Sequence, residues 1–135
     1  MRRTAALIAV LGAAALGGAV LAQDGPKPPP GPEEEKVARD AEAAAVKAGQ
    51  KLFSDPSIGA GERACVTCHE NPKRPDLSLR GVPARFPRYD ADAGKVITIQ
   101  EKFVQMQERS LKARKTFPLG DARWTALELY LRGLK

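Results

Sequence analysis

Two cysteines and a histidine lie within five residues of the chain, in the order Cys65-Val66-Thr67-Cys68-His69. Two thiols three positions apart, followed directly by a histidine, are the attachment pattern of a c-type haem. Each thiol can add across one vinyl group of the porphyrin, while the turn between them brings the imidazole beneath the ring. The pattern therefore predicts one covalently attached haem c, held through Cys65 and Cys68, with His69 as an axial ligand of the iron.

Other chemistries of these residues are less consistent with the sequence. Cys65 and Cys68 are the only cysteines and His69 is the only histidine, so the four ligands of a structural zinc site are not available from this set. A redox dithiol or a structural disulfide stays open as an alternative. That alternative leaves the adjoining histidine without a role, and the flanking sequence lacks the βαβ pattern of thioredoxin-like proteins.

The second axial position of the iron decides between electron transfer and ligand chemistry. If the N-terminal segment is removed, Met106 is the only methionine left, and it follows His69 by 37 residues, enough for the chain to return on the opposite face. A methionine that only fills the core is the alternative. We expect Met106 to be the sixth ligand, which makes the iron an electron-transfer centre. The reserve ligands are lysines, namely Lys102, Lys112 and Lys115.

Residues around the motif are candidates for supporting the haem. A histidine that binds a metal usually donates its other ring N–H to a backbone carbonyl, and we expect the carbonyl of Pro72 or Pro75 to accept it here. Further side chains after the motif could contact the haem and its propionates. They are Arg80, Arg85, Arg88, Tyr89 and Trp124.

The N-terminal segment has the composition of a targeting sequence. Arg2 and Arg3 precede an apolar run that ends in small residues, so residues 1–22 are predicted to be a signal peptide that exports the chain to the periplasm. An uncleaved membrane anchor is the alternative, because the 18 nearly apolar residues from Ala5 to Ala22 approach the ~20 that span a bilayer. Residues 23–32 are proline-rich and predict a linker.

Residues 33–135 are expected to form one domain. Three glutamates open a helix predicted over residues 33–53, and a loop over 54–63 leads to a short helical turn that carries the haem motif. Four prolines between residues 71 and 93 exclude regular structure there and predict a long wrapping loop. A turn is expected over 90–94 and a short extended piece over 96–99.

Two further helices complete the domain. Thr98 as N-cap and Glu101 three residues later predict a capping box and a helix that ends near Lys112. Gly120-Asp121 starts a last helix, expected to reach Leu134, with apolar residues at helical spacing. The predicted fold class is all-α.

The charge distribution indicates the kind of partner. Without its first 22 residues the chain has 20 basic and 16 acidic side chains, and residues 63–135 hold 15 of the basic and eight of the acidic ones. A basic surface around a redox centre favours an acidic redox protein as partner. Nucleic acid is excluded as a partner class, because the chain is predicted to be exported and has no nucleic-acid-binding motif.

Three segments together resemble class I cytochromes c: Gly49-Gln50-Lys51-Leu52-Phe53, the motif at Cys65–His69, and Leu127-Glu128-Leu129-Tyr130-Leu131. In that family the first and last helices cross near a glycine and aromatic residues. The resemblance covers most of residues 45–135. It implies a small fold of helices wrapped around one haem, with a long loop between them.

The middle of the domain carries a narrower resemblance. Arg85-Phe86-Pro87-Arg88-Tyr89-Asp90 and Val96-Ile97-Thr98-Ile99-Gln100-Glu101 are similar to the cytochrome domains of thiosulfate dehydrogenase and of the Sox sulfur-oxidising system. Those domains commonly carry a cysteine that ligates a catalytic haem in a stretch like residues 101–110. Aligning Glu101 and the Arg109-Ser110 pair places Met106 at that cysteine. The resemblance thus implies a relative without the catalytic thiolate.

The sequence as a whole predicts an exported monohaem cytochrome c that is not itself an enzyme. It would carry single electrons between protein partners, with a link to sulfur-compound oxidation suggested by the resemblance. Two other functions stay open: an electron-relay subunit of a periplasmic dehydrogenase complex, and a haem sensor or substrate-binding cytochrome whose sixth ligand is labile.

Overall fold

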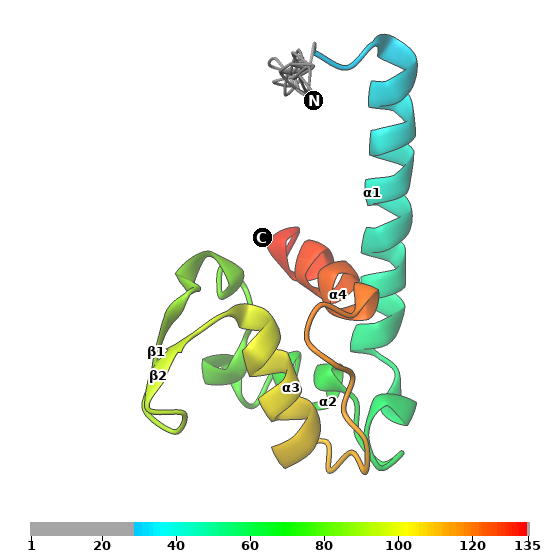
Figure 1. The fold of residues 1–135 in the computed structure, drawn as a ribbon. Coiled ribbons are helices and arrows are strands. Elements are labelled where there is room, and N and C mark those ends of the chain that lie inside the picture. Colours follow the sequence, from blue (N-terminus) through cyan, green and yellow to red (C-terminus); the bar gives the residue numbers. More distant parts are fainter. Residues whose placement is uncertain (1–28, 135) are drawn as a thin grey trace, which may run out of the picture.

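The computed structural model describes residues 29–134, and most of the regular secondary structure in this range is helical. Within that range, four α-helices follow one another (Figure 1): α1 (Pro32–Phe53), α2 (Cys65–His69), α3 (Ile99–Arg109) and α4 (Ala122–Arg132). The predicted signal peptide, most of the predicted linker and Lys135 lie outside the described residues. None of the helices described for residues 29–134 has both the length and the hydrophobicity that a bilayer-spanning helix needs.

The first and last helices cross closely. Gly49 of α1 is buried, and a Cβ at this position would overlap the carbonyl oxygen of Ala126 and lie 2.9 Å from Cβ of Tyr130. Beside this contact, the rings of Phe53 and Tyr130 pack with centroids 5.5 Å apart. The crossing at a glycine and aromatic residues agrees with the expectation from the resemblance, because only glycine lets two helix backbones approach so closely.

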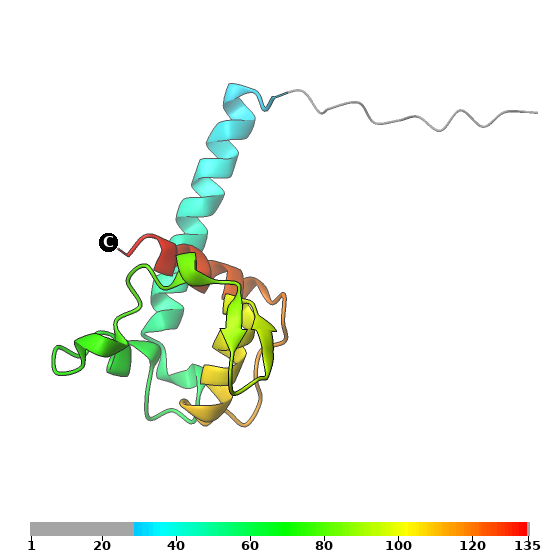
Figure 2. The same cartoon turned by 90° about the vertical axis from the view of Figure 1, so that its left-hand side faces the viewer.

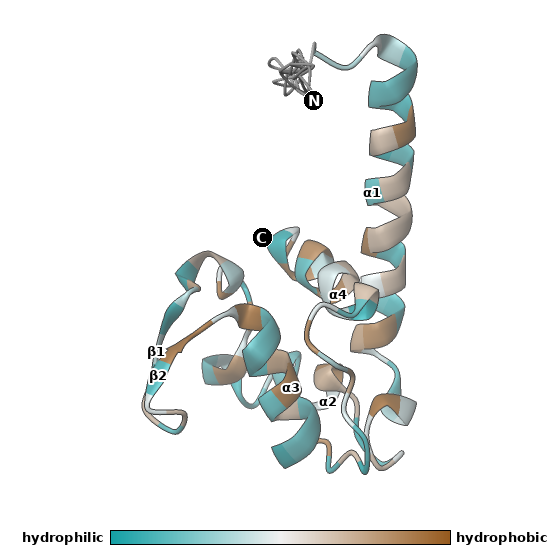
Figure 3. Ribbon diagram, viewed as in Figure 1, coloured by the Kyte–Doolittle hydropathy of each residue, from teal (hydrophilic) through white to brown (hydrophobic). Residues whose placement is uncertain are grey.

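The N-terminal half of α1 extends away from the rest of the domain (Figures 1 and 2). All side chains from residue 32 to residue 44 are exposed. Ion pairs along the helix stabilise this half locally, with 3.0 Å between Lys36 and Asp40 and 3.5 Å between Glu35 and Arg39. Figure 3 shows its first turn as hydrophilic, which fits the acidic side chains at the positive end of the helix dipole.

A two-stranded antiparallel hairpin corrects the prediction that residues 71–93 lack regular structure, while the mostly helical backbone agrees with the predicted all-α class. Strand β1 (Arg88–Asp90) pairs with β2 (Lys95–Ile97), with Tyr89 opposite Val96. The chain turns as predicted, since Gly94 N donates to Asp90 O over 2.9 Å. Pro87 is the last proline before β1, so the residues after it have free N–H groups for a ladder. Two one-turn 3₁₀ segments, at Pro75–Leu77 and Pro83–Arg85, interrupt the loop before the hairpin.

Helix α3 begins with the predicted capping box and ends earlier than predicted. Thr98 Oγ1 accepts from Glu101 N over 3.2 Å, and Glu101 Oε2 accepts from Thr98 N over 2.7 Å. The helix stops at Arg109 instead of Lys112, because Lys112 takes a left-handed backbone conformation with φ of 55°. Helix α4 starts after its N-cap Asp121 and stops at Arg132, so it is also shorter than the predicted 120–134.

The Glu101 cap predicts an acid-sensitive contribution to stability. Hydrogen bonds from Lys95 and Thr98 lower the pKa of Glu101 to about 2 from its usual 4.5. A depressed folded-state pKa means that the contribution is complete above pH 4.5 and is lost as the pH falls toward 2. We therefore expect Glu101→Gln to lower the melting temperature at pH 6, and the difference from the wild type to shrink by pH 2.5. A difference that did not depend on pH would contradict this role.

The hydrophobic core is small and lies against α4. Its buried cluster consists of Phe53, Trp124, Leu127 and Leu131, each no more than 2% exposed. The ring of Trp124 packs on Phe117 and Phe103, with centroids 5.1 and 5.6 Å away. The four cluster residues also line a cavity, so the core of this domain is the wall of that cavity.

Candidate functional site

The two cysteines sit on α2 with different exposures. Thr67 Oγ1 accepts a hydrogen bond from Ala64 N over 3.1 Å, which closes the first turn of this short helix. Cys65 is half-buried and lines the cavity, whereas Cys68, three residues later, is exposed. Both are free thiols. The two thiols thus lie on one short helix beside the cavity, as the attachment pattern of a c-type haem requires.

The environment of Cys65 does not favour the redox-dithiol alternative. Burial raises the pKa of the Cys65 thiol to about 11. Reactive dithiol motifs need a thiolate at neutral pH and therefore a lowered pKa. A thiol that stays protonated is a poor nucleophile for disulfide exchange.

His69 is held by one backbone carbonyl. Its Nδ1 lies 2.6 Å from Leu77 O, and because a carbonyl can only accept, Nδ1 must carry the proton. Nε2 is then left with a free electron pair, as an axial iron ligand requires. The prediction that the carbonyl of Pro72 or Pro75 accepts this hydrogen bond is therefore wrong. The 3₁₀ turn at Pro75–Leu77 brings the third residue of the turn to the imidazole instead.

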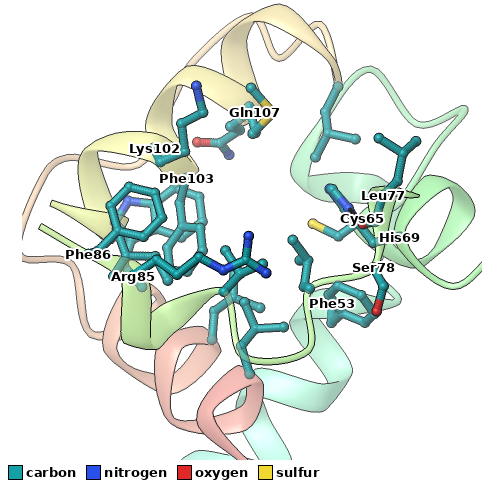
Figure 4. Close-up of a pocket in the computed structure, with 18 of the residues that line it drawn as sticks. Phe53, Cys65, His69, Leu77, Ser78, Arg85, Phe86, Lys102, Phe103 and Gln107 are labelled. Carbon is teal, nitrogen blue, oxygen red and sulfur yellow. Dashed lines mark hydrogen bonds between the residues drawn. The ribbon is translucent and has the colours of Figure 1, made fainter. Parts of the chain in front are cut away.

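A cavity of about 300 Å³ lies between α2, α3 and α4. Figure 4 shows Cys65 and His69 on one wall and Phe103 and Gln107 of α3 on another. The lining is mainly apolar and comes from every part of the domain, with Phe53, Ile58, Leu77, Leu79, Val82, Phe86, Ile99, Leu111, Trp124, Leu127 and Leu131 among its residues. A predominantly apolar cavity with a few polar groups is the usual form of a cofactor site.

Met106 also lines this cavity. Its sulfur accepts a hydrogen bond from Ser110 Oγ, 3.6 Å away and one turn later on the chain. Of the reserve ligands, Lys102 lines the cavity, but its ammonium is bound to Asp90 over 2.8 Å and to Gln105 over 3.1 Å. Lys112 and Lys115 are exposed and are not among the lining residues. The fold thus brings the thioether of Met106 to the same cavity as His69.

The residues expected to contact the haem divide into two groups. Arg85, Arg88 and Trp124 line the cavity, and in Figure 4 the Arg85 guanidinium points toward its middle. Arg80 lies in a separate depression beside His69, and Tyr89 is 66% exposed on β1, away from the cavity lining. The fold therefore brings three of the five residues to the cavity.

Gln107 was not identified from the sequence. It is buried and lines the cavity. Its side-chain Nε2 donates one hydrogen bond and its Oε1 accepts another. Ile99, Phe103 and Gln107 follow one another at spacings of four, so they lie on one face of α3. A polar residue on that apolar face was the available signal.

The residues present fit a covalently bound haem c. The thiols of Cys65 and Cys68 adjoin an imidazole whose Nδ1 is bound to Leu77 O, and the mainly apolar cavity next to them is also lined by the thioether of Met106. Arg85 has no carboxylate partner within residues 29–134 and can neutralise an acidic group in the cavity. A metal site built from three or more His, Cys, Asp or Glu side chains does not occur in that range.

Comparison with known proteins gave one family. The family model for the SoxA/TsdA cytochrome c domain matches residues 48–134. Neither the curated proteins nor the solved structures gave a match. The matched range begins one residue before Gly49 and includes the motif, the hairpin, α3 and α4, which are the parts that form the cavity.

Proposed function

We propose, since the chain belongs to the SoxA/TsdA cytochrome c domain family, that it is an exported monohaem cytochrome c that carries single electrons between protein partners. The family membership confirms the resemblance inferred from the residues, and it makes the chain a c-type cytochrome with covalently bound haem c. The observation that carries the finer proposal is the joint presence of Cys65, His69 and Met106 in one cavity.

Two axial ligands from the chain suit outer-sphere electron transfer. Bound haem c supplies a one-electron iron couple. His69 is oriented by Leu77 O, and Met106 offers a neutral, soft sulfur that favours the ferrous state and raises the reduction potential. The cavity around them has a mainly apolar lining. If His69 and Met106 both bound the iron of that haem, no coordination position would be left for a substrate.

Arginines at the cavity are proposed to hold the propionates. Arg85 and Arg88 line it, and Arg88 also stacks on Phe86, with 4.9 Å between the guanidinium carbon and the ring centroid. A guanidinium is always charged and binds carboxylates with two parallel hydrogen bonds. Tyr89 and Arg80 stay predicted contacts without a place in the cavity lining.

The spectrum and mass of the mature protein test this function. We expect protein made in cells competent for cytochrome c assembly to be heavier than the bare chain by one haem. The ferric form should show the weak far-red absorption band of methionine-ligated haem (the methionine band). The ferrous form should not bind carbon monoxide. A colourless product with the mass of the bare polypeptide would contradict the proposal. Rapid carbon monoxide binding would favour the haem sensor instead.

The family links the chain to sulfur-compound oxidation, and Met106 limits what it does there. A methionine replaces the cysteine that ligates the catalytic haem in similar domains, so we propose a role as electron carrier in such a pathway. We propose the periplasm as its location because residues 1–22 have the composition of a signal peptide. If that segment is not cleaved, the domain is anchored to the membrane instead.

An electron-relay subunit of a larger complex is the second candidate function. The exposed half of α1, residues 32–44, favours it, because a helix without tertiary contacts presents a whole surface to a partner subunit. Co-purification of a larger redox subunit from the native host, in constant ratio and at high salt, would support this candidate. A chain that purifies without a partner would contradict this candidate and favour a free electron carrier.

An acidic redox protein is the partner that the charges favour. Arg63 lies two residues before Cys65, and Lys112, Arg114 and Lys115 follow the cavity residue Leu111. Their two loops are joined, since Ala60 N donates to Leu111 O over 2.8 Å. In residues 29–134 none of the four has a carboxylate within 4.0 Å. We call these four side chains the basic loop patch.

Charge reversal in the basic loop patch is expected to slow reduction by an acidic protein. Arg114→Glu with Lys115→Glu should lower the rate with reduced flavodoxin, an acidic probe, by about tenfold at low ionic strength and less at high salt. The matched control is Lys47→Glu with Lys51→Glu on α1, which changes the net charge equally. Stopped-flow kinetics measures both. Equal slowing by the two variants would show that only net charge acts and would contradict the patch.

A further inference from the structure

Gln107 is a buried amide whose polar atoms are both used. It is 1% exposed and belongs to the mainly apolar lining of the cavity, where Figure 4 shows it on the same helix as Phe103. Its Nε2 donates to Ile58 O over 2.8 Å, and its Oε1 accepts from Phe117 N, also over 2.8 Å. A buried amide costs free energy unless it is hydrogen-bonded, so this position is specific for a group that both donates and accepts.

These two bonds join three segments that meet only through the fold. Ile58 precedes the haem motif, Gln107 is on the last two turns of α3, and Phe117 lies between α3 and α4. Backbone bonds reinforce the same junction, from Ala113 N to Gln107 O over 3.0 Å and from Ala60 N to Leu111 O over 2.8 Å. The end of α3 is therefore fixed relative to the loop that leads to Cys65.

Fixing Gln107 also fixes the direction of its neighbour. Successive residues of an α-helix point about 100° apart, since one turn takes 3.6 residues. If the end of α3 turned about its axis, Met106 would leave the cavity and Gln107 would lose both partners. Within residues 29–134 the Met106 sulfur makes one hydrogen bond, with Ser110 Oγ over 3.6 Å, and this bond stays at the same helix end and does not fix the helix to another segment.

We propose that Gln107 is a positioning residue for the sixth iron ligand. Its amide holds the end of α3 so that the sulfur of Met106 stays directed at the cavity in both oxidation states. This inference rests on the proposed function, because it requires Met106 to ligate the iron. A leucine of similar size would fill the same space without orienting the helix.

Competition by cyanide for the ferric iron tests the inference on the haem-loaded full chain. Gln107→Leu removes both hydrogen bonds, and we expect cyanide to bind at least about tenfold more tightly, with a weaker methionine band. The control is Thr98→Ala, which removes the N-cap at the other end of the same helix. It should lower the melting temperature by a comparable amount and leave cyanide affinity within about twofold of the wild type.

A second variant covers failure of Gln107→Leu to fold. Gln107→Asn keeps an amide that is too short to reach Ile58 O and Phe117 N together, so cyanide affinity should rise here as well. If cyanide bound equally tightly to the wild type and to either Gln107 variant, with the methionine band intact, the positioning role of Gln107 would be wrong. The proposed ligation by Met106 would not be affected by that result. A wild type without that band would overturn the proposed Met106 ligation and this inference with it.

Discussion

Met106→Ala is expected to open the iron to external ligands while the haem stays covalently attached. The variant removes a lining residue of the cavity that no other sulfur can replace, because the two cysteines are expected to be consumed as thioethers. Water or hydroxide would then occupy the sixth position. We expect loss of the methionine band, rapid carbon monoxide binding by the ferrous form, and a reduction potential lower by on the order of 100 mV, since axial ligands set potentials over ~0.8 V.

The control for this prediction is Lys102→Ala. Lys102 also lines the cavity from α3, one turn before Met106, and it is the reserve ligand nearest to it. Its ammonium is engaged by Asp90, so the methionine band and the resistance to carbon monoxide should persist in this variant. A Met106→Ala protein with an unchanged spectrum would show that Met106 only packs in the cavity wall. If Lys102→Ala lost the methionine band and Met106→Ala kept it, the assignment of Met106 as the iron ligand would be wrong.

Local patterns in the sequence predicted the parts of the site that depend on near neighbours. The motif Cys65–His69 lies on a helical turn, and the box of Thr98 and Glu101 starts α3, because both are determined within five residues. The crossing of α1 and α4 was predicted only through the family resemblance. Helix ends were less accurate, since α3 stops where the left-handed Lys112 and contacts to another loop take over.

Contacts between distant segments could not be predicted from spacing. The acceptor for His69 is Leu77 and not a proline, because the 3₁₀ turn at Pro75–Leu77 decides which carbonyl reaches the imidazole. The partners of Gln107 are 49 and 10 residues away, and no pattern in the sequence marks them. The hairpin was missed for a related reason: proline density was taken over the whole of residues 71–93, although β1 follows the last proline.

Gly49→Ala is expected to destabilise the domain strongly, even though alanine is the better helix former by about 1 kcal/mol. The added Cβ would overlap the carbonyl oxygen of Ala126, and its other neighbour, Cβ of Tyr130, is 2.9 Å away. A backbone carbonyl within α4 cannot move aside without shifting the helix. We expect a loss of about 3 kcal/mol or more in the free energy of unfolding, at the upper end of overpacking costs.

The helix shift caused by Gly49→Ala would also reach the cofactor site, because Trp124, Leu127 and Leu131 of the same helix α4 line the cavity. For a domain of about 100 residues, 3 kcal/mol corresponds to a melting temperature lower by roughly 12–24 °C, measurable by circular dichroism. Gln50→Ala is the control: its position is the next on α1 and is exposed, so it tests helix propensity without the crossing. If Gly49→Ala melted no lower than Gln50→Ala, α1 and α4 could not be in the contact described.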